Sequence, residues 1–163
     1  MLCDLIPTGP LSQPNTTESQ KKSVIASWEI MVLVALCHEP NAGKEPSEIV
    51  TSVRSFVLGS LARAIQDAVV LEEPVDARYG RLYALSDLTF RLLTAAPFAQ
   101  RLSANSSDAP MQIAKIMLEK NFAAMLTNAL ADVDLNFPFL QRLLNSILWT
   151  LEHPTKVVTK IGR

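Results

Sequence analysis

Apolar residues recur at alternating steps of three and one through the last third of the chain, between residues 111 and 160. This stretch predicts three successive helices with the sequences MQIAKIMLEK, NFAAMLTNALADV and FPFLQRLLNSILWTLE. The apolar positions are Phe122, Met125, Leu126, Ala129, Leu130 and Val133 in the second helix, and Leu140, Leu143, Leu144, Ile147, Leu148 and Leu151 in the third. The pattern puts one broad apolar stripe on each helix, and each stripe must be buried against a neighbour.

The ends of these helices also follow from the sequence. Asp108 can cap the first of the three and Asn136 the third, with Pro110 and Pro138 in the respective first turns. The link 134–136 is so short that the last two helices must be neighbours. Short links between helices that each need a partner surface are typical of armadillo or HEAT-like solenoids.

The rest of the chain divides into shorter segments. Residues 1–21 predict a partial helix, MLCDLI, followed by a flexible loop, and residues 22–95 predict a three-helix solenoid segment with helices near 22–38, 46–71 and 76–95. A polar loop at 96–110 precedes the armadillo-like three-helix repeat at 111–163. No sustained two-residue alternation predicts a strand, so the fold class is all-α, a solenoid of about six helices.

The first two of these helices carry specific expectations. The helix near 22–38 is apolar on nearly all sides, which predicts a central helix covered by others. In the next helix we expect the buried face to include Ile49, Val53, Phe56 and Val57. Gly59 lies inside that helix and either costs about 1 kcal/mol relative to alanine or marks a close helix crossing.

Composition excludes several classes of function. The 163 residues are 48% apolar and 19% charged, enough for one domain with a real core. The net charge of −1 gives no bias toward nucleic acid or anionic membrane.

The longest apolar run, 24–37, contains Glu29 and is shorter than the roughly 20 residues of a membrane span. The start MLCDLIPTGP lacks the features of a signal peptide, and two cysteines favour a reducing compartment, cytoplasmic or nuclear.

We expect no catalytic, cofactor-binding or metal-binding residue. His38 and His153 sit where helices are expected to end and are interpreted as surface caps. Cys37 beside His38 could form half of a metal site, but a buried helix cysteine is the favoured interpretation, and Cys3 has no partner. The pair Glu72-Glu73 before Pro74 is interpreted as a solvated helix end.

Basic residues form two weak groups, Arg78, Arg81 and Arg91 along one helix, and Lys156, Lys160 and Arg163 at the C-terminus. Such stripes can bind RNA or a phosphopeptide. The favoured interpretation is a solvated helix face for the first group and compensation of a helix dipole for the second. Further along, Pro154 should bend or end the last helix near Leu151.

Several motifs resemble a segment of the giant HECT-type E3 ubiquitin-protein ligases, whose long armadillo-like solenoid precedes a catalytic domain. The motifs are Met117-Leu118-Glu119-Lys120, Leu126 with Leu130-Ala131-Asp132-Val133, Asp134-Leu135-Asn136-Phe137-Pro138, Asn145-Ser146-Ile147-Leu148, Leu151-Glu152 and Thr155-Lys156-Val157-Val158. Upstream, Ala77–Leu85 and Arg91-Leu92-Leu93 are similar to the preceding helix, especially in fungal members. The resemblance covers about 76–160, more faintly 22–72, and departs at Pro154.

The resemblance implies a substrate-binding scaffold segment that acts in protein ubiquitination. The HECT domain with its catalytic cysteine has no counterpart in this chain, so Cys3 and Cys37 inherit no role. The implied partners are protein substrates and neighbouring solenoid repeats, without nucleic acid or membrane. The alternatives are a stand-alone armadillo-like adaptor and, far behind, an enzyme in its own right. As a solenoid fragment, the chain alone should aggregate or form oligomers.

Overall fold

The computed structural model describes residues 17–38, 48–95, 109–138 and 140–161. These residues form six helices and no strand, which confirms the predicted all-α class. The helices are α2 (Thr17–Cys37), α3 (Glu48–Val70), α4 (Val75–Thr94), α5 (Ala109–Glu119), α6 (Phe122–Ala131) and α7 (Leu140–Ile161). They pack as a helical array of the solenoid kind.

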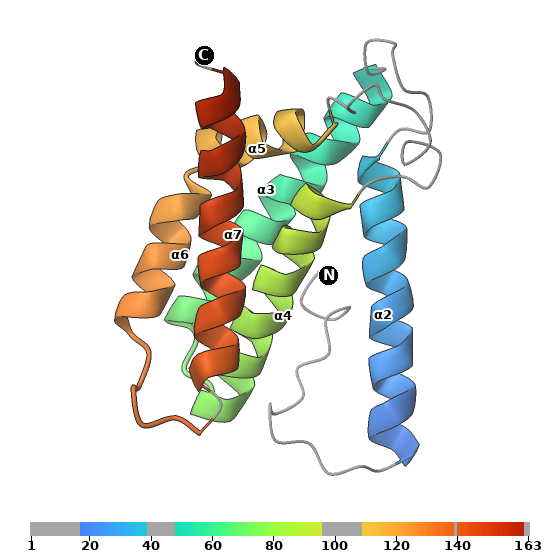
Figure 1. Cartoon of the computed structure of the whole chain (residues 1–163). Helices are drawn as coiled ribbons and strands as arrows, with labels where there is room; N and C mark the ends of the chain where they lie inside the picture. Colours follow the sequence, from blue (N-terminus) through green and yellow to red (C-terminus); the bar gives the residue numbers. More distant parts are fainter. Residues whose placement is uncertain (1–16, 39–47, 96–108, 139, 162–163) are drawn as a thin grey trace.

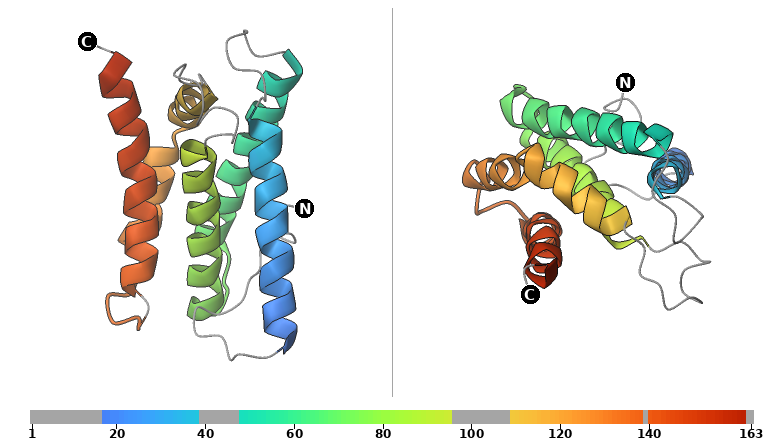
Figure 2. Two further views of the ribbon diagram at one scale, coloured as in Figure 1. Left: turned by 45° about the vertical axis from the view of Figure 1, so that its right-hand side comes forward. Right: turned by 90° about the horizontal axis from the view of Figure 1, so that it is seen from above.

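Helix α4 lies at the centre of the array, and α2 and α7 flank it on opposite sides (Figure 1). Helix α3 packs behind α4 and also contacts α2 and α6. Helix α5 runs across one end of the bundle, where it contacts α3, α4 and α7 (Figure 2). The most extensive of these packings joins α4 to α7.

One continuous apolar core joins all six helices. Its fully buried members include Leu61, Ile65, Leu85, Ile113 and Leu143, and Cys37 is the buried contribution of α2. The predicted stripe of α6 is confirmed, because Phe122, Met125, Leu126, Ala129 and Val133 are buried and Leu130 packs against them. The α5–α6 junction is made by Asn121 at φ 60°, a left-handed conformation that asparagine tolerates better than most residues.

Tyr79 anchors the link between α6 and α7. Its ring lies edge-on to Phe137 at 4.8 Å, and its hydroxyl accepts a hydrogen bond from the Asp134 amide at 2.6 Å. The prediction that α6 and α7 are neighbours is confirmed. The prediction that Asn136 caps α7 is wrong, since its amide donates to Asp134 Oδ1 within the turn and α7 begins at Leu140.

The expected central position of the first helix is wrong. Helix α2 stands at the edge of the array and packs through Ala26, Ile30, Leu33, Val34 and Cys37. Its opposite side is also apolar but exposed. From the sequence alone, a helix with both apolar sides covered cannot be distinguished from a helix with only one side covered. Among the described residues, no element covers the second apolar side of α2.

The stripes of α3 and α7 are each rotated from their predicted positions. On α3, Ile49 and Phe56 are exposed while Arg54 is buried. On α7, Leu148 is exposed, whereas Ser146 and Thr150 are buried with Leu143 and Ile147. Polar side chains, Arg54 on α3 and Ser146 and Thr150 on α7, therefore occupy buried positions outside the predicted apolar stripes.

Helix α7 continues through Pro154 to Ile161, so of the two expected effects of Pro154, a bend or an end near Leu151, the end is wrong. A proline removes one helical hydrogen bond, here to the Thr150 carbonyl, and buried packing of its ring can offset that loss. His153 accordingly lies inside the helix and not at its end.

Other helix limits differ by a few residues. Helix α2 begins five residues before Lys22, with an ion pair of 3.1 Å between Lys22 and Glu18 in its first turns, and α5 begins at Ala109. The partial helix at 1–6, the loops at 7–16 and 96–108, the proposed Asp108 cap, and the residues Cys3 and Arg163 lie outside the described residues. So do the side chains of Lys156 and Lys160.

Candidate functional site

A buried polar junction joins the end of α2 to three other helices. Arg54 on α3 is only 2% exposed, and its Nε donates to the Cys37 carbonyl at 2.7 Å. Its Nη1 donates to Gln112 Oε1 on α5 at 2.6 Å. His38 Nε2 lies 3.0 Å from the Leu92 carbonyl of α4. A guanidinium at the carbonyl end of α2 satisfies groups that the helix leaves without partners and complements its dipole.

The electrostatics of this junction do not favour catalysis. Burial raises the pKa of the Cys37 thiol to about 11, against a smaller opposing effect of the Arg54 charge, so the thiol is protonated and a poor nucleophile. Burial also lowers the pKa of His38. The hydrogen bond to the Leu92 carbonyl raises this pKa, and the charge of Arg54 lowers it. The buried-cysteine interpretation is confirmed, and the surface-cap interpretation of His38 is wrong.

The three arginines of α4 are held by local contacts. Arg81 pairs with Glu73 at 2.6 Å, Arg91 pairs with Asp87 at 2.7 Å, and the Arg78 guanidinium lies 5.2 Å from the centre of the Tyr79 ring. Each of the three is therefore in contact with a nearby side chain of its own chain. Glu73 is partly buried in its pair, so the solvated-end interpretation holds for the exposed Glu72 alone.

An open pocket of about 290 Å³ lies between α4 and α7, lined by Phe90, Trp149, Glu152 and His153. The Phe90 ring centre lies 6.0 Å from that of Trp149 and 6.1 Å from that of His153. Trp149 is 56% exposed, so its indole is open to solvent. The sequence-based analysis missed this pocket; the available signal was a tryptophan next to the apolar stripe, followed by glutamate and histidine on the same side of the helix.

The exposed side of α2 carries the second notable surface, here called the α2 stripe: Val24, Ile25, Trp28, Met31, Val32 and Leu36. All six side chains are at least half exposed, and Trp28 reaches 63%. Their spacing places them along one side of the helix, opposite the residues that enter the core. Adjoining exposed side chains of this kind mark interaction surfaces.

The two histidines, both interpreted from the sequence as surface caps, are not brought together. His38 belongs to the buried junction, whereas His153 borders the pocket with Phe90. Within the described ranges, no group of three or more His, Cys, Asp or Glu residues could hold a metal ion. None of the helices in those ranges combines the length and apolar character needed to cross a membrane.

Comparisons with known proteins identify relatives over the whole chain. The chain is 29% identical over 156 residues to "E3 ubiquitin-protein ligase ptr1" of Schizosaccharomyces pombe, covering 93% of this chain and 5% of the relative. It is 29% identical over 181 aligned positions to "E3 ubiquitin-protein ligase TOM1-like" of Neurospora crassa, covering 100% of this chain and 4% of the relative. A third relative, "Probable E3 ubiquitin-protein ligase TOM1" of Eremothecium gossypii, is 31% identical over 99 residues, or 59% of this chain and 3% of its own length.

No family model matches the chain, and no solved structure matches it. The chain spans at most 5% of the length of these relatives, which confirms the resemblance as one to a short part of much larger proteins. The chain is thus similar to a short segment of fungal E3 ubiquitin-protein ligases of the ptr1 and TOM1 type.

Proposed function

We propose that this chain is a scaffold segment of a HECT-type E3 ubiquitin ligase and acts in protein ubiquitination by holding protein substrates. The relatives are named as ubiquitin-protein ligases, and each is many times longer than the matched region. In this account the segment does no chemistry. It forms part of a curved helical surface that orients substrates toward a catalytic domain elsewhere in a longer parent chain, in the cytoplasm or nucleus.

The structural observation that carries the scaffold part of this proposal is the exposed α2 stripe. A helix with apolar residues on both sides is expected between two packed layers, and the part of the chain that the structure describes supplies one of them, the α3–α4 side. Burying such side chains contributes roughly 1.5–3 kcal/mol each when burial is complete. Neighbouring repeats of a solenoid bury each other's faces in this way, so we assign the α2 stripe to contact with an adjacent helical repeat.

The buried junction supports a scaffolding role by fixing the orientation of α2. Arg54 joins α3 to the end of α2 and to α5, and His38 joins the same end to α4. A rigidly held α2 presents its stripe at a constant angle to whatever packs on it. Rigid mutual orientation is what a solenoid needs to maintain its curvature over many repeats.

The test is an immunoblot of native extract with an antibody against the chain, coupled to ubiquitin transfer by the captured protein. A band far larger than 17.9 kDa that accepts ubiquitin from a charged conjugating enzyme as a thioester supports the proposal. A band near 17.9 kDa without ligase activity overturns it and leaves the stand-alone adaptor. Cleavage of the thioester by dithiothreitol, whose thiol displaces the cysteine thiolate, distinguishes a catalytic cysteine from stable ubiquitin attachment.

A further inference from the structure

His38 follows the last residue of α2 and is held at the end of the bundle that α5 crosses (Figure 1). The residue is only 9% exposed, and its Nε2 lies 3.0 Å from the Leu92 carbonyl on α4. A carbonyl oxygen can only accept a hydrogen bond, so Nε2 carries the proton of the neutral ring. The other ring nitrogen, Nδ1, is buried and has no hydrogen-bond partner among the described residues.

A second proton on the ring would disturb this arrangement. Protonation adds an N–H donor at Nδ1 together with a positive charge, and the buried position keeps both away from water. The charged ring regains full hydrogen bonding by moving out to solvent. Because His38 directly follows Cys37, movement of the ring draws the last turn of α2 away from α4.

Two further groups at the junction, Arg54 and Cys37, can carry charge. Arg54 on α3 stays positive at every pH at which the chain folds, and its charge acts against a second positive charge on His38. Burial of Nδ1 opposes protonation irrespective of the other partners of Arg54. The Cys37 thiol stays neutral, because burial raises its pKa to about 11. Neither group therefore changes its charge in mildly acidic solution.

The contributions of α4 and α5 to the junction are uncharged. Helix α4 contributes the Leu92 carbonyl, and the adjacent Arg91 is 55% exposed and paired with Asp87 at 2.7 Å. Helix α5 contributes the amide of Gln112, which accepts a hydrogen bond from the guanidinium of α3. Among the described groups that contact this end of α2, the imidazole is thus the one that titrates between neutral and mildly acidic pH.

We propose that His38 is an acid-sensitive latch, which holds the end of α2 on α4 while its ring is neutral and releases that end when Nδ1 is protonated. The opening is local, because Ile30 and Leu33 keep the preceding turns of α2 packed on the core. It exposes the Cys37 thiol and frees the orientation of α2. The inference stands apart from the scaffold proposal, since it concerns contacts within the described residues and not what covers the α2 stripe.

Modification of the Cys37 thiol measures the opening. In a Cys3→Ser variant Cys37 is the only thiol, and 4,4′-dithiodipyridine reacts with thiols in mildly acidic as well as neutral solution. The rate, divided into that of N-acetyl-cysteine amide at the same pH, gives the protection of Cys37. We expect this protection to fall about three- to tenfold between about pH 7.5 and 5.5, because a solvated histidine is protonated below about pH 6.5.

Two histidine variants isolate the latch. The amide of His38→Gln can still donate from Nε2 to the Leu92 carbonyl but does not titrate, so protection should stay constant over the same pH range. The matched control His153→Gln changes the other histidine of the chain, which borders the pocket between α4 and α7, and should leave the fall in protection unchanged.

Low concentrations of urea separate local opening from unfolding of the whole chain. Local opening exposes little surface, so the modification rate at about pH 5.5 should depend only weakly on urea below the unfolding transition. A steep dependence would show global unfolding and overturn the proposal. Protection of Cys37 that does not change with pH, or that falls equally in His38→Gln, would overturn it as well.

Discussion

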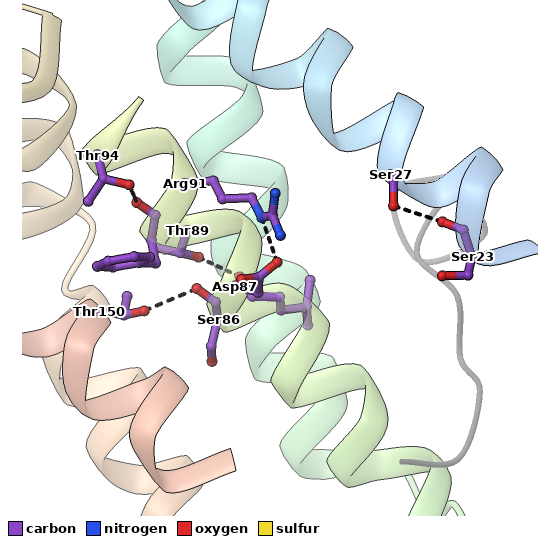
Figure 3. A network of polar contacts seen from close by, with 10 residues as sticks. Ser23, Ser27, Ser86, Asp87, Thr89, Arg91, Thr94 and Thr150 are labelled. Atoms are coloured by element: carbon purple, nitrogen blue, oxygen red, sulfur yellow. Dashed lines mark hydrogen bonds and ion pairs between the residues drawn. The ribbon is translucent and has the colours of Figure 1, made fainter. Parts of the chain in front are cut away.

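The Thr150 hydroxyl on α7 donates a hydrogen bond to the Ser86 carbonyl on α4 at 3.0 Å, across the most extensive helix packing of the array (Figure 3). The same hydroxyl lies 2.8 Å from the Ser146 carbonyl of its own helix. Both serines and Thr150 are buried, and their small volume lets the two backbones approach. The Ser86 hydroxyl itself has no hydrogen-bond partner among the described residues.

Substitution Ser86→Ala should therefore stabilise the chain. It removes a buried hydroxyl without a partner and very little volume, and the backbone carbonyl that Thr150 uses remains. We expect the free energy of unfolding to rise by about 1 kcal/mol in urea titration. The comparison variant Thr150→Val removes a hydroxyl that does have a partner and should lower stability by about 1 kcal/mol, so equal effects of the two changes would refute this interpretation.

Substitution Gly59→Ala should stabilise α3. A Cβ at this position would meet only the flexible end of Lys120, with Nζ at 3.4 Å and Cε at 3.8 Å. Of the two sequence interpretations, the unfavourable helix propensity of glycine is therefore the relevant one. We expect a gain of roughly 0.5–1 kcal/mol in the same titration. A loss of stability would show that Lys120 cannot move and that the α3–α5 crossing requires glycine.

Substitution Arg54→Met should destabilise the chain by about 2–4 kcal/mol. Methionine fills much of the space but leaves the Cys37 carbonyl and Gln112 Oε1 without these charged donors. The double variant Arg54→Met with Gln112→Leu should recover part of the loss, since the buried amide is removed as well. Arg63→Met on the exposed side of the same helix is the matched control and should change stability by less than about 0.5 kcal/mol.

Stability should fall as pH decreases below about 6.5, because of His38. The pKa of His38 is lowered in the folded chain, so as the pH falls the histidine is protonated in the unfolded chain before it is protonated in the folded chain. The lower pH therefore favours the unfolded chain. Urea titrations between about pH 7.5 and 5.5 should show this decline before most carboxylates titrate. The His38→Gln variant should flatten the decline; an unchanged slope would assign it to other groups.

The sequence predicted the six helices of the described ranges, the limits of α3 and α4 to within about two residues, and the buried stripe of α6. Amphipathic periodicity is strong in a short helix such as α6 that has one covered side. The sequence did not predict that α2 lies at the edge. Residues 24–36 look the same whether their second side is covered by this chain or by another segment. It also placed Leu148 and Phe56 in the core, because counting apolar residues cannot show that Thr150 and Arg54 find buried partners on distant helices.

The candidate sites were predicted less well. The Trp149 pocket depends on Phe90, which is distant in sequence and joins it only through the packing of α4 against α7. Long-range pairs of this kind leave no periodic signal. The position of His153 was predicted wrongly for a local reason, the continuation of α7 through Pro154.

Oxidation of Trp28 by hydroxyl radicals measures most directly whether the α2 stripe is covered. The two states to compare are the isolated chain and the native protein captured from extract, with Trp149 as the reference residue on the same chain. The scaffold account predicts that Trp28 oxidation falls several-fold relative to Trp149 in the native protein, because an adjacent repeat packs on the stripe. Equal relative oxidation in the two states would contradict it, since the stripe would then be exposed in the protein that functions in the cell.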